Sequence, residues 1–342
     1  MELIGIGDLH FDKLDPIIPD ASELICASVE KVFRYALKKG VRHVVFYGDI
    51  CERPRMSYHS QVLFYRTLLK AEYSDLVFHV ILGNHDFAED GTHSLQVLET
   101  VCESIGRPIH VYTKATRTIL DGVPFNFLPH PYTETSKNAV NVGHFEVAGS
   151  LRDNGRKIEE GHSKNHVTLM GHLHTNHRVR NTHYSGTLYQ TNFGEVEGKF
   201  FHHVTATGPS PSEVEVNNVK FTSPWRLVNL IVDTPEVLDT METDHRVLYK
   251  LFMKDGVDVD LNSVLTKYPN VVRHNTFKSK KDLEVMVSQA WEFDSDIIED
   301  VVNEDEEVMV TQFLKAEGFK KKQVKQGLQI LHRVKGTTKV KA

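Results

Sequence analysis

The sequence has 342 residues, with 40 Lys and Arg against 46 Asp and Glu, which gives a net charge of −6. Hydrophobic residues make up 40% of it, so the chain can bury the cores of about two domains, and general disorder is excluded. A surface that is basic throughout is also excluded, so any nucleic acid must bind in a local groove or through a partner. No stretch approaches the roughly 18 apolar residues of a membrane span, and the start carries charge, so we expect a cytoplasmic protein with no membrane contact.

The first hundred residues alternate short apolar runs with stretches of helical spacing. The pattern predicts strands at 3–6, 41–47 and 76–82, and helices at 20–39 and 57–71. This alternation is typical of an α/β layer fold. Each predicted strand is followed by Gly-Asp or Gly-Asn, at the strand end where open α/β sheets place functional residues.

From about residue 108 the pattern changes to short β-like runs separated by turns, and helices become scarce. These runs are 109–112, 116–120, 124–128, 140–144, 167–170 and 178–184. They predict a second sheet that packs on the first. We therefore expect an α/β fold built on a two-sheet β-sandwich flanked by helices.

The remainder of the chain is expected to form smaller parts. Gly, Pro and Ser cluster at 208–212, and mixed short elements follow at 225–233, 247–253 and 271–276. We predict a sandwich domain at 1–204, a small α+β capping and DNA-binding domain at 205–280, and a linker with C-terminal helices at 281–342.

The C-terminal segment combines opposite charge blocks with amphipathic spacing. Residues 292–307 are acidic, and basic residues dominate from 315 onward. Apolar residues recur at i, i+4 and i+7 in two predicted helices, 306–317 with Met309, Phe313 and Ala316, and 320–333 with Val324, Leu328 and Leu331. These stripes must be buried, either on the chain's own core or on a partner.

Five short polar motifs carry the candidate chemistry. They are Asp8-Leu9-His10, Gly48-Asp49, Gly83-Asn84-His85-Asp86, Gly143-His144 and Gly171-His172-Leu173-His174. On an extended strand end, alternate residues such as Asp8 and His10, or His172 and His174, point to the same side. Carboxylate, imidazole and amide ligands without thiolate suit two divalent ions such as Mn²⁺, Fe²⁺ or Zn²⁺, with Mn²⁺ favoured and Mg²⁺ as a further alternative. Structural zinc is disfavoured because Cys26, Cys51 and Cys102 form no CxxC pair.

The order and spacing of these motifs resemble the calcineurin-like metallophosphoesterase superfamily over about residues 1–205. Within it the chain is similar to the SbcD-type recombination nucleases, since residues 184–195, YSGTLYQTNFGE, resemble the segment that those nucleases carry after GHxH. The compact length and short cap are most like the nuclease subunits of T-even-type bacteriophages.

The resemblance implies a role for each motif residue. It places one ion on Asp8, His10 and His174, the other on Asn84, His144 and His172, and a bridging carboxylate on Asp49. A shared carboxylate offsets the repulsion between ions about 3.5–4 Å apart, and such a pair clamps the attacking and leaving oxygens of a phosphodiester. His85 corresponds to the catalytic histidine that protonates the leaving oxygen or stabilises its charge, with Asp86 orienting its ring.

The sequence departs from the family pattern at Glu52. Many relatives carry Asp or His three positions after the Gly-Asp aspartate, whereas this chain has Ile50-Cys51-Glu52. Glu52 adds negative charge near the phosphate path unless it binds a ligand or hydrogen bonds. The balance between exonuclease and endonuclease action is therefore open.

We predict a Mn²⁺-dependent DNA nuclease, with the duplex lying across the metal cleft. Candidate phosphate contacts are Arg53, Arg55, His59 and Arg178, together with Lys70, Arg107 and Arg180. The resemblance implies 3′→5′ digestion of duplex DNA ends, an SMC-like ABC-type ATPase bound through the C-terminal helices, and a homodimer within a two-plus-two assembly.

Two other classes of function compete with the nuclease. A phosphatase acting on protein or small phosphoesters fits the metal ligands, but the chain has GNHD where phosphoprotein phosphatases have GNHE, and it lacks their Asp-Arg-Gly signature. A non-catalytic scaffold would not need to keep every ligand type together with His85.

Overall fold

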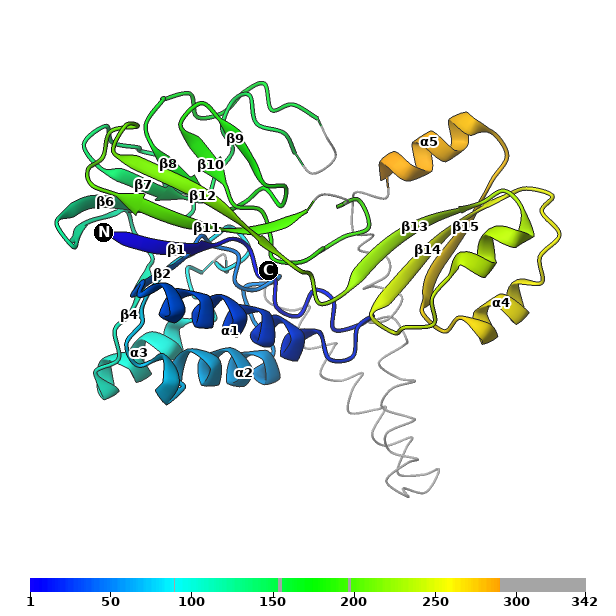
Figure 1. Ribbon diagram of the computed structural model, residues 1–342, viewed down its shortest axis with the longest axis horizontal. Coiled ribbons are helices and arrows are strands. Elements are labelled where there is room, and N and C mark those ends of the chain that lie inside the picture. Colours follow the sequence, from blue (N-terminus) through cyan, green and yellow to red (C-terminus); the bar gives the residue numbers. More distant parts are fainter. Residues whose placement is uncertain (89, 153–155, 196–197, 290–342) are drawn as a thin grey trace, which may run out of the picture. The chain divides into compact units, whose positions relative to one another are not determined.

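The computed structural model describes residues 1–289, apart from 89, 153–155 and 196–197 (Figure 1). Two six-stranded sheets make up most of it, each with parallel and antiparallel neighbours. The predicted α/β class with two sheets flanked by helices is confirmed. The predicted C-terminal helices at 306–317 and 320–333 lie outside the described residues.

The first sheet has the strand order β12-β11-β1-β2-β3-β4. Its strands are β1 (Glu2–Ile6), β2 (His43–Phe46), β3 (Val77–Ile81), β4 (Ile109–Tyr112), β11 (Lys199–Ala206) and β12 (Val214–Phe221). Our assignment of 109–112 to the second sheet is wrong, because β4 pairs in parallel with β3. A parallel neighbour requires a crossover, and helix α3 (Gln96–Ile105), which we did not predict, provides it.

The second sheet has the order β5-β6-β7-β8-β10-β9. Its strands are β5 (Thr116–Leu120), β6 (Val123–Leu128), β7 (Val140–Gly143), β8 (Thr168–Met170), β9 (His177–Val179) and β10 (Thr182–Tyr184). The run predicted at 178–184 is two strands rather than one. Arg180 has a positive φ of 54°, which reverses the chain and lets β9 pair antiparallel with β10.

Helices α1 (Ala21–Lys39) and α2 (Tyr58–Leu69) cover the outer face of the first sheet (Figure 1). The ring of Phe33 on α1 contacts Phe46 and Phe78 on the sheet, with centroids 6.3 and 4.8 Å apart. α1 ends at Gly40, whose φ of 72° lets its N–H cap the last turn. A short 3₁₀ helix, η1 (Ala71–Tyr73), follows α2.

The main core lies between the two sheets. Buried side chains of the first sheet, such as Leu3, Val45 and Ile81, pack in one cluster with those of the second, such as Phe125 and Leu169. With helices outside and a core inside, β1, β2 and β3 are covered on both faces. Their carboxyl ends are therefore fixed in place, and the polar motifs follow directly after them.

The residues after β12 form a third, parallel sheet of β13 (Arg226–Val232), β14 (Val247–Lys254) and β15 (Val271–Phe277). It is accompanied by η2 (Pro235–Thr240), α4 (Leu261–Lys267) and α5 (Lys280–Gln289). Our three domain ranges stay predictions, although β12 extends the first sheet to Phe221, beyond residue 204. Among the described residues, no helix combines the length and apolarity needed to cross a membrane.

Candidate metal centre

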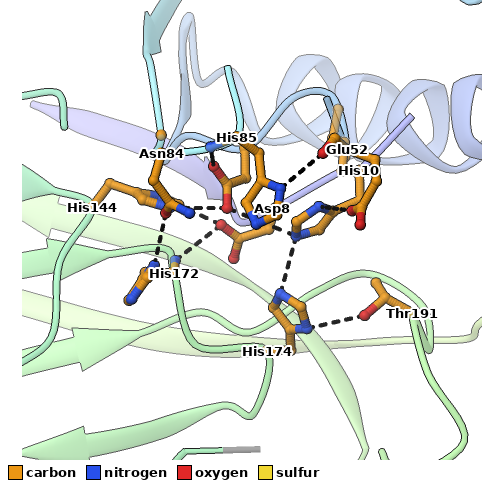
Figure 2. A network of polar contacts seen from close by, with 12 residues as sticks. Asp8, His10, Glu52, Asn84, His85, His144, His172, His174 and Thr191 are labelled. Carbon is orange, nitrogen blue, oxygen red and sulfur yellow. Dashed lines mark hydrogen bonds and ion pairs between the residues drawn. The ribbon is translucent and has the colours of Figure 1, made fainter. Parts of the chain in front are cut away.

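The five polar motifs meet at one place, although they come from both sheets (Figure 2). Three follow β1, β2 and β3, and two follow β7 and β8. Contacts join the predicted ligands directly. The Nε2 atom of His144 lies 3.1 Å from both Asn84 Oδ1 and Asp49 Oδ2, and the Nε2 atoms of His10 and His174 are 3.0 Å apart.

The backbone brings these side chains together by turning sharply rather than by strand alternation. β1 ends at Ile6 and β8 at Met170, before the motif residues begin. His10, Asp49 and His172 instead have positive φ angles of 47°, 48° and 78°. Our expectation that extended strand ends align the motif residues is therefore wrong. Such left-handed backbone in non-glycine residues is strained and is concentrated at functional sites.

The motif glycines leave room for the functional atoms. A Cβ at Gly48 would lie 2.4 Å from His144 Nδ1, and one at Gly83 would lie 2.1 Å from Asp49 Oδ1. At Gly171 it would lie 2.4 Å from the carbonyl oxygen of Tyr47. Any side chain at these positions would displace a predicted ligand or its support, so the close approach of five loops requires glycine.

One half of the site is built around Asp49 and His144. His144 donates from Nδ1 to the Tyr47 carbonyl oxygen at 2.7 Å, which points its Nε2 at Asp49 and Asn84. His172 places its Nδ1 3.1 Å from the same Asn84 oxygen. Ligand atoms of Asp49, His144 and His172 lie within 4.8 Å of one another, close enough to share a cation.

The other half of the site contains His10, His174 and Glu52. The Nδ1 atom of His10 lies 2.7 Å from Glu52 Oε2, and its Nε2 lies 3.9 Å from Asp49 Oδ2. His10, Glu52 and His85 form a second group whose ligand atoms lie within 4.8 Å of one another. Asp49 therefore lies between the two halves, where a bridging carboxylate would be needed.

His85 is held by the backbone of the neighbouring loop. The ring Nδ1 of His85 donates to the Glu52 carbonyl oxygen at 2.8 Å, and the backbone N–H of His85 donates to Asp49 Oδ1 at 3.0 Å. Our expectation that Asp86 orients this ring is wrong. Asp86 instead accepts bonds from Gly83 N at 2.8 Å and Cys51 N at 3.1 Å, so it fastens the 83–86 turn to the loop after β2.

Burial and charge set the protonation of the Asp49 half. Burial alone would raise the pKa of Asp49, but His144, His10 and His85 hold it well below its usual range. Burial opposes a charge on His144, yet Asp49 raises the pKa of His144 to about 9. These two shifts describe one buried ion pair. Burial also lowers the pKa of His172 to about 3, which keeps this imidazole neutral and able to bind a metal.

Asp8 provides a direct test of whether a cation fits. Its Oδ1 accepts the N–H of His172 at 2.9 Å, whereas its Oδ2 is buried and has no hydrogen-bond partner among the described residues. Burial raises the pKa of Asp8 to about 6, and the nearby Asp49 adds to the rise. A bound cation would satisfy the unpartnered oxygen and stabilise both carboxylates, so this donor set fits divalent metal.

The predicted DNA contacts fall into two groups. Arg53 and Arg55 are exposed and follow Glu52 by one and three positions. The others engage groups of the chain itself. His59 pairs with Glu23 at 3.0 Å, and Arg178 donates to the Arg180 carbonyl oxygen at 2.6 Å.

Several residues that contact the predicted ligands were not expected from the sequence. Glu195 Oε1 lies 3.2 Å from His174 Nδ1, and Thr191 Oγ1 lies 3.0 Å from the same atom. Lys199 pairs with Glu195, and Lys13 pairs with Glu52 at 3.2 Å. The stretch from Tyr184 to Glu195 contains two of these residues, but nothing in its composition indicates which side chains turn inward.

Comparison with known families gives one match. A family model for calcineurin-like phosphoesterases matches residues 1–203. This range includes all five motifs, the strands β1, β2, β3, β7 and β8 that precede them, and Glu195. No curated protein matches the chain.

Proposed function

The chain belongs to the calcineurin-like phosphoesterase family, whose members hydrolyse phosphoesters with divalent metals, and on this premise we propose that it is a Mn²⁺-dependent DNA nuclease. The observation that supports the proposal best is the meeting of five loops around Asp49. On either side of this carboxylate lies a group of imidazole, carboxylate or amide ligands. His85 lies beside them.

Two divalent ions would be held by the residues that the motifs supply. Asp8, His10 and His174 would hold one ion, Asn84, His144 and His172 would hold the other, and Asp49 would bridge them. When bound, the ions supply positive charge for the phosphate oxygens and make water nucleophilic at neutral pH. A donor set of four imidazoles and three oxygen ligands without thiolate is compatible with Mn²⁺, the ion that we propose, with Mg²⁺ as the alternative.

His85 would act on the leaving oxygen. Its Nδ1–H is fixed on the carbonyl oxygen of Glu52, so Nε2 is the nitrogen available to the substrate. In the imidazolium form, a proton on Nε2 can pass to the leaving oxygen or stabilise its charge. The hydrogen bond from the backbone N–H of His85 to Asp49 Oδ1 places His85 beside the metal ligands.

Duplex DNA is the substrate we favour over a phosphate monoester. The loop after Gly48-Asp49 continues with Glu52, Arg53 and Arg55, and both arginines are exposed. Two exposed cations can position a phosphate backbone without reading its sequence. We propose 3′→5′ exonuclease action. Endonuclease action stays open, because Glu52, which pairs with Lys13 at 3.2 Å, stands where many relatives carry Asp or His.

The test is a cleavage assay of the purified chain with Mn²⁺. One substrate is linear duplex DNA labelled at a 3′ end, and the other is a small aryl phosphate monoester. We expect labelled mononucleotides that disappear on chelation by EDTA. Monoester hydrolysis with intact DNA would move the protein to the phosphatase class.

We also propose an SMC-like ABC-type ATPase as partner, within a two-plus-two assembly that contains a homodimer of this chain. The proposal rests on the amphipathic spacing at 306–333, which lies outside the described residues. We place the assembly in the cytoplasm, or in the host cytoplasm if the chain is encoded by a phage.

Deletion of 303–342 tests this assignment. Because the phosphoesterase match ends at residue 203, we expect the truncated chain to keep most of its nuclease activity and to lose ATPase binding in a pull-down. If the truncated chain unfolds, the segment packs on its own core instead.

A further inference from the structure

The rings of His10 and His174 face each other through the same atom. Their Nε2 atoms are 3.0 Å apart, and the Nδ1 atom of each ring lies on the side away from this contact (Figure 2). Each Nδ1 meets a carboxylate, with His10 2.7 Å from Glu52 Oε2 and His174 3.2 Å from Glu195 Oε1. Both histidines are predicted ligands of the same ion.

The contacts of His174 fix which of its nitrogens carries the hydrogen. An ionised carboxylate can only accept a hydrogen bond, so the Nδ1 atom of His174 donates to Glu195. The Nδ1 atom of His10 contacts Glu52 Oε2 at 2.7 Å as an ion pair, without the alignment of a hydrogen bond. Thr191 supports the assignment for His174, because its hydroxyl donates to Glu195 at 2.5 Å and can therefore only accept from Nδ1. The Nε2 atom of His174 then presents its lone pair toward His10 Nε2, and with a hydrogen on His10 Nδ1 as well, both Nε2 atoms would face one point where a metal ion fits.

Each glutamate is paired with a lysine on its far side. Lys13 Nζ lies 3.2 Å from Glu52 Oε2, and Lys199 Nζ contacts Glu195 Oε2. Lys199 and Glu195 are 6% and 2% exposed, so this pair is buried inside the fold. The lysine beside each glutamate offsets the negative charge that the carboxylate brings to the site.

The other half of the site is built differently. His144 donates its Nδ1–H to the backbone oxygen of Tyr47, and His172 presents Nδ1 itself toward Asn84. The two Lys-Glu-His series, Lys13-Glu52-His10 and Lys199-Glu195-His174, therefore converge on one ion position. They come from four segments far apart in the sequence.

From this geometry we propose that Glu52 and Glu195 are positioning residues that hold His10 and His174 in the metal-binding tautomer for one of the two ions. The inference rests on the metal centre of the proposed function and adds two residues to it. The carboxylate behind each histidine orients the ring and makes its Nε2 a stronger donor. It also gives Glu52 a role at the position where the sequence departs from its family.

The test is calorimetric titration of Mn²⁺ into the full chain and into Glu52→Gln and Glu195→Gln. Glutamine keeps the shape and a carbonyl acceptor but removes the charge. We expect each variant to weaken one of the two binding events by about 10- to 100-fold. The other event should stay within about twofold, because its histidines contact neither glutamate.

Glu30→Gln is the matched control, because Glu30 also pairs with a lysine, Lys70, but lies on α1. It should leave both binding events unchanged. Nitrogen-15 chemical shifts of the imidazoles give a second measurement, in which Glu52→Gln should alter His10 and leave His174 unchanged. If Glu195→Gln does not fold, the size of the Glu52→Gln effect decides for Glu52, because 10- to 100-fold weaker binding of an ion that is still bound indicates positioning and complete loss of the ion indicates a direct ligand.

Two results would overturn the inference while leaving the nuclease proposal intact. In the first, both variants bind two Mn²⁺ ions with wild-type affinity. In the second, Glu52→Gln abolishes one ion while Glu195→Gln has no effect, which would make Glu52 a direct ligand with His10 and His85. If the wild-type chain binds no Mn²⁺, the proposed function itself fails.

Discussion

The two sheets carry two groups of histidines, and the surroundings of these groups differ. One group, including His10 and His144, follows the strand ends beside Asp8 and Asp49. The other lies within the strands, where His79 on β3 contacts His43 Nδ1 at 3.1 Å and the Tyr112 hydroxyl at 2.9 Å.

The mid-strand group is packed like an aromatic core. His79 stacks on His110, Tyr112 and Phe127, with ring centroids 5.2, 6.0 and 5.5 Å apart. Burial lowers the pKa of His79 to about 3, and repulsion from His43 and His110 adds to this shift. Histidines therefore indicate a metal centre only where carboxylates and strained turns bring their ring nitrogens to one point.

The largest expected effect comes from removing the carboxylate that joins the two halves. Asp49→Asn should reduce Mn²⁺ binding and phosphodiester cleavage by about a thousandfold or more, because several kcal/mol of stabilisation at the metal pair is lost. Metal content by mass spectrometry and cleavage rates measure this. Asp121→Asn, beside His43 at 3.4 Å, makes the same change at the other group and should alter neither.

Replacing His85 should separate chemistry from metal binding. His85→Ala should slow cleavage by about 10²- to 10⁴-fold, the usual contribution of a general acid, with both ions still bound. Single-turnover cleavage and metal content measure the two effects on one preparation. His110→Ala, in the mid-strand group, is the control and should change neither quantity. If His85→Ala instead loses metal in parallel with activity, His85 is a metal ligand.

The smallest effect concerns stability in acid. The folded-state pKa of His79 lies below the ordinary value of 6.5, so only the unfolded chain takes up a proton between pH 6.5 and about 3. The titration of this histidine therefore leaves the free energy of unfolding unaffected above pH 6.5, and decreases it as the pH falls from 6.5 to about 3.

In His79→Gln the free energy of unfolding should therefore decrease less steeply as the pH is lowered over that range. The difference in slope should be up to about 1.4 kcal/mol per pH unit. Urea unfolding at successive pH values measures the slope. His245→Gln, on a side chain that is 70% exposed, should leave it unchanged. An equal change in both variants would mean that burial of His79 has no effect on the slope.

Much of the fold could be predicted from local pattern. The strands β1, β2 and β3 are short apolar runs, and each is followed by a glycine and a polar residue, so both the elements and the motif positions are visible in sequence. Sheet membership was not visible. The run at 109–112 joins the first sheet because α3 carries the chain across, and local periodicity contains no information about this pairing.

The site was predictable in its ligand types but not in its supports. Asp8 and Asp49 stand out because they follow strand ends, whereas the positive φ of Asp49 depends on loops that meet only in the folded chain. The same holds for Glu195, whose contact with His174 joins residues that are 21 positions apart. For Asp86, proximity in sequence was misleading. It is adjacent to His85 in the chain, but its carboxylate accepts a hydrogen bond from Gly83 N.

The central claim is that the strand-end group binds two metal ions and the mid-strand group binds none. X-ray diffraction at the manganese absorption edge, from crystals grown with Mn²⁺, tests it directly. We expect two anomalous peaks about 3.5–4 Å apart, on either side of Asp49. Peaks beside His43 and His79, or no peak near Asp49, would contradict it.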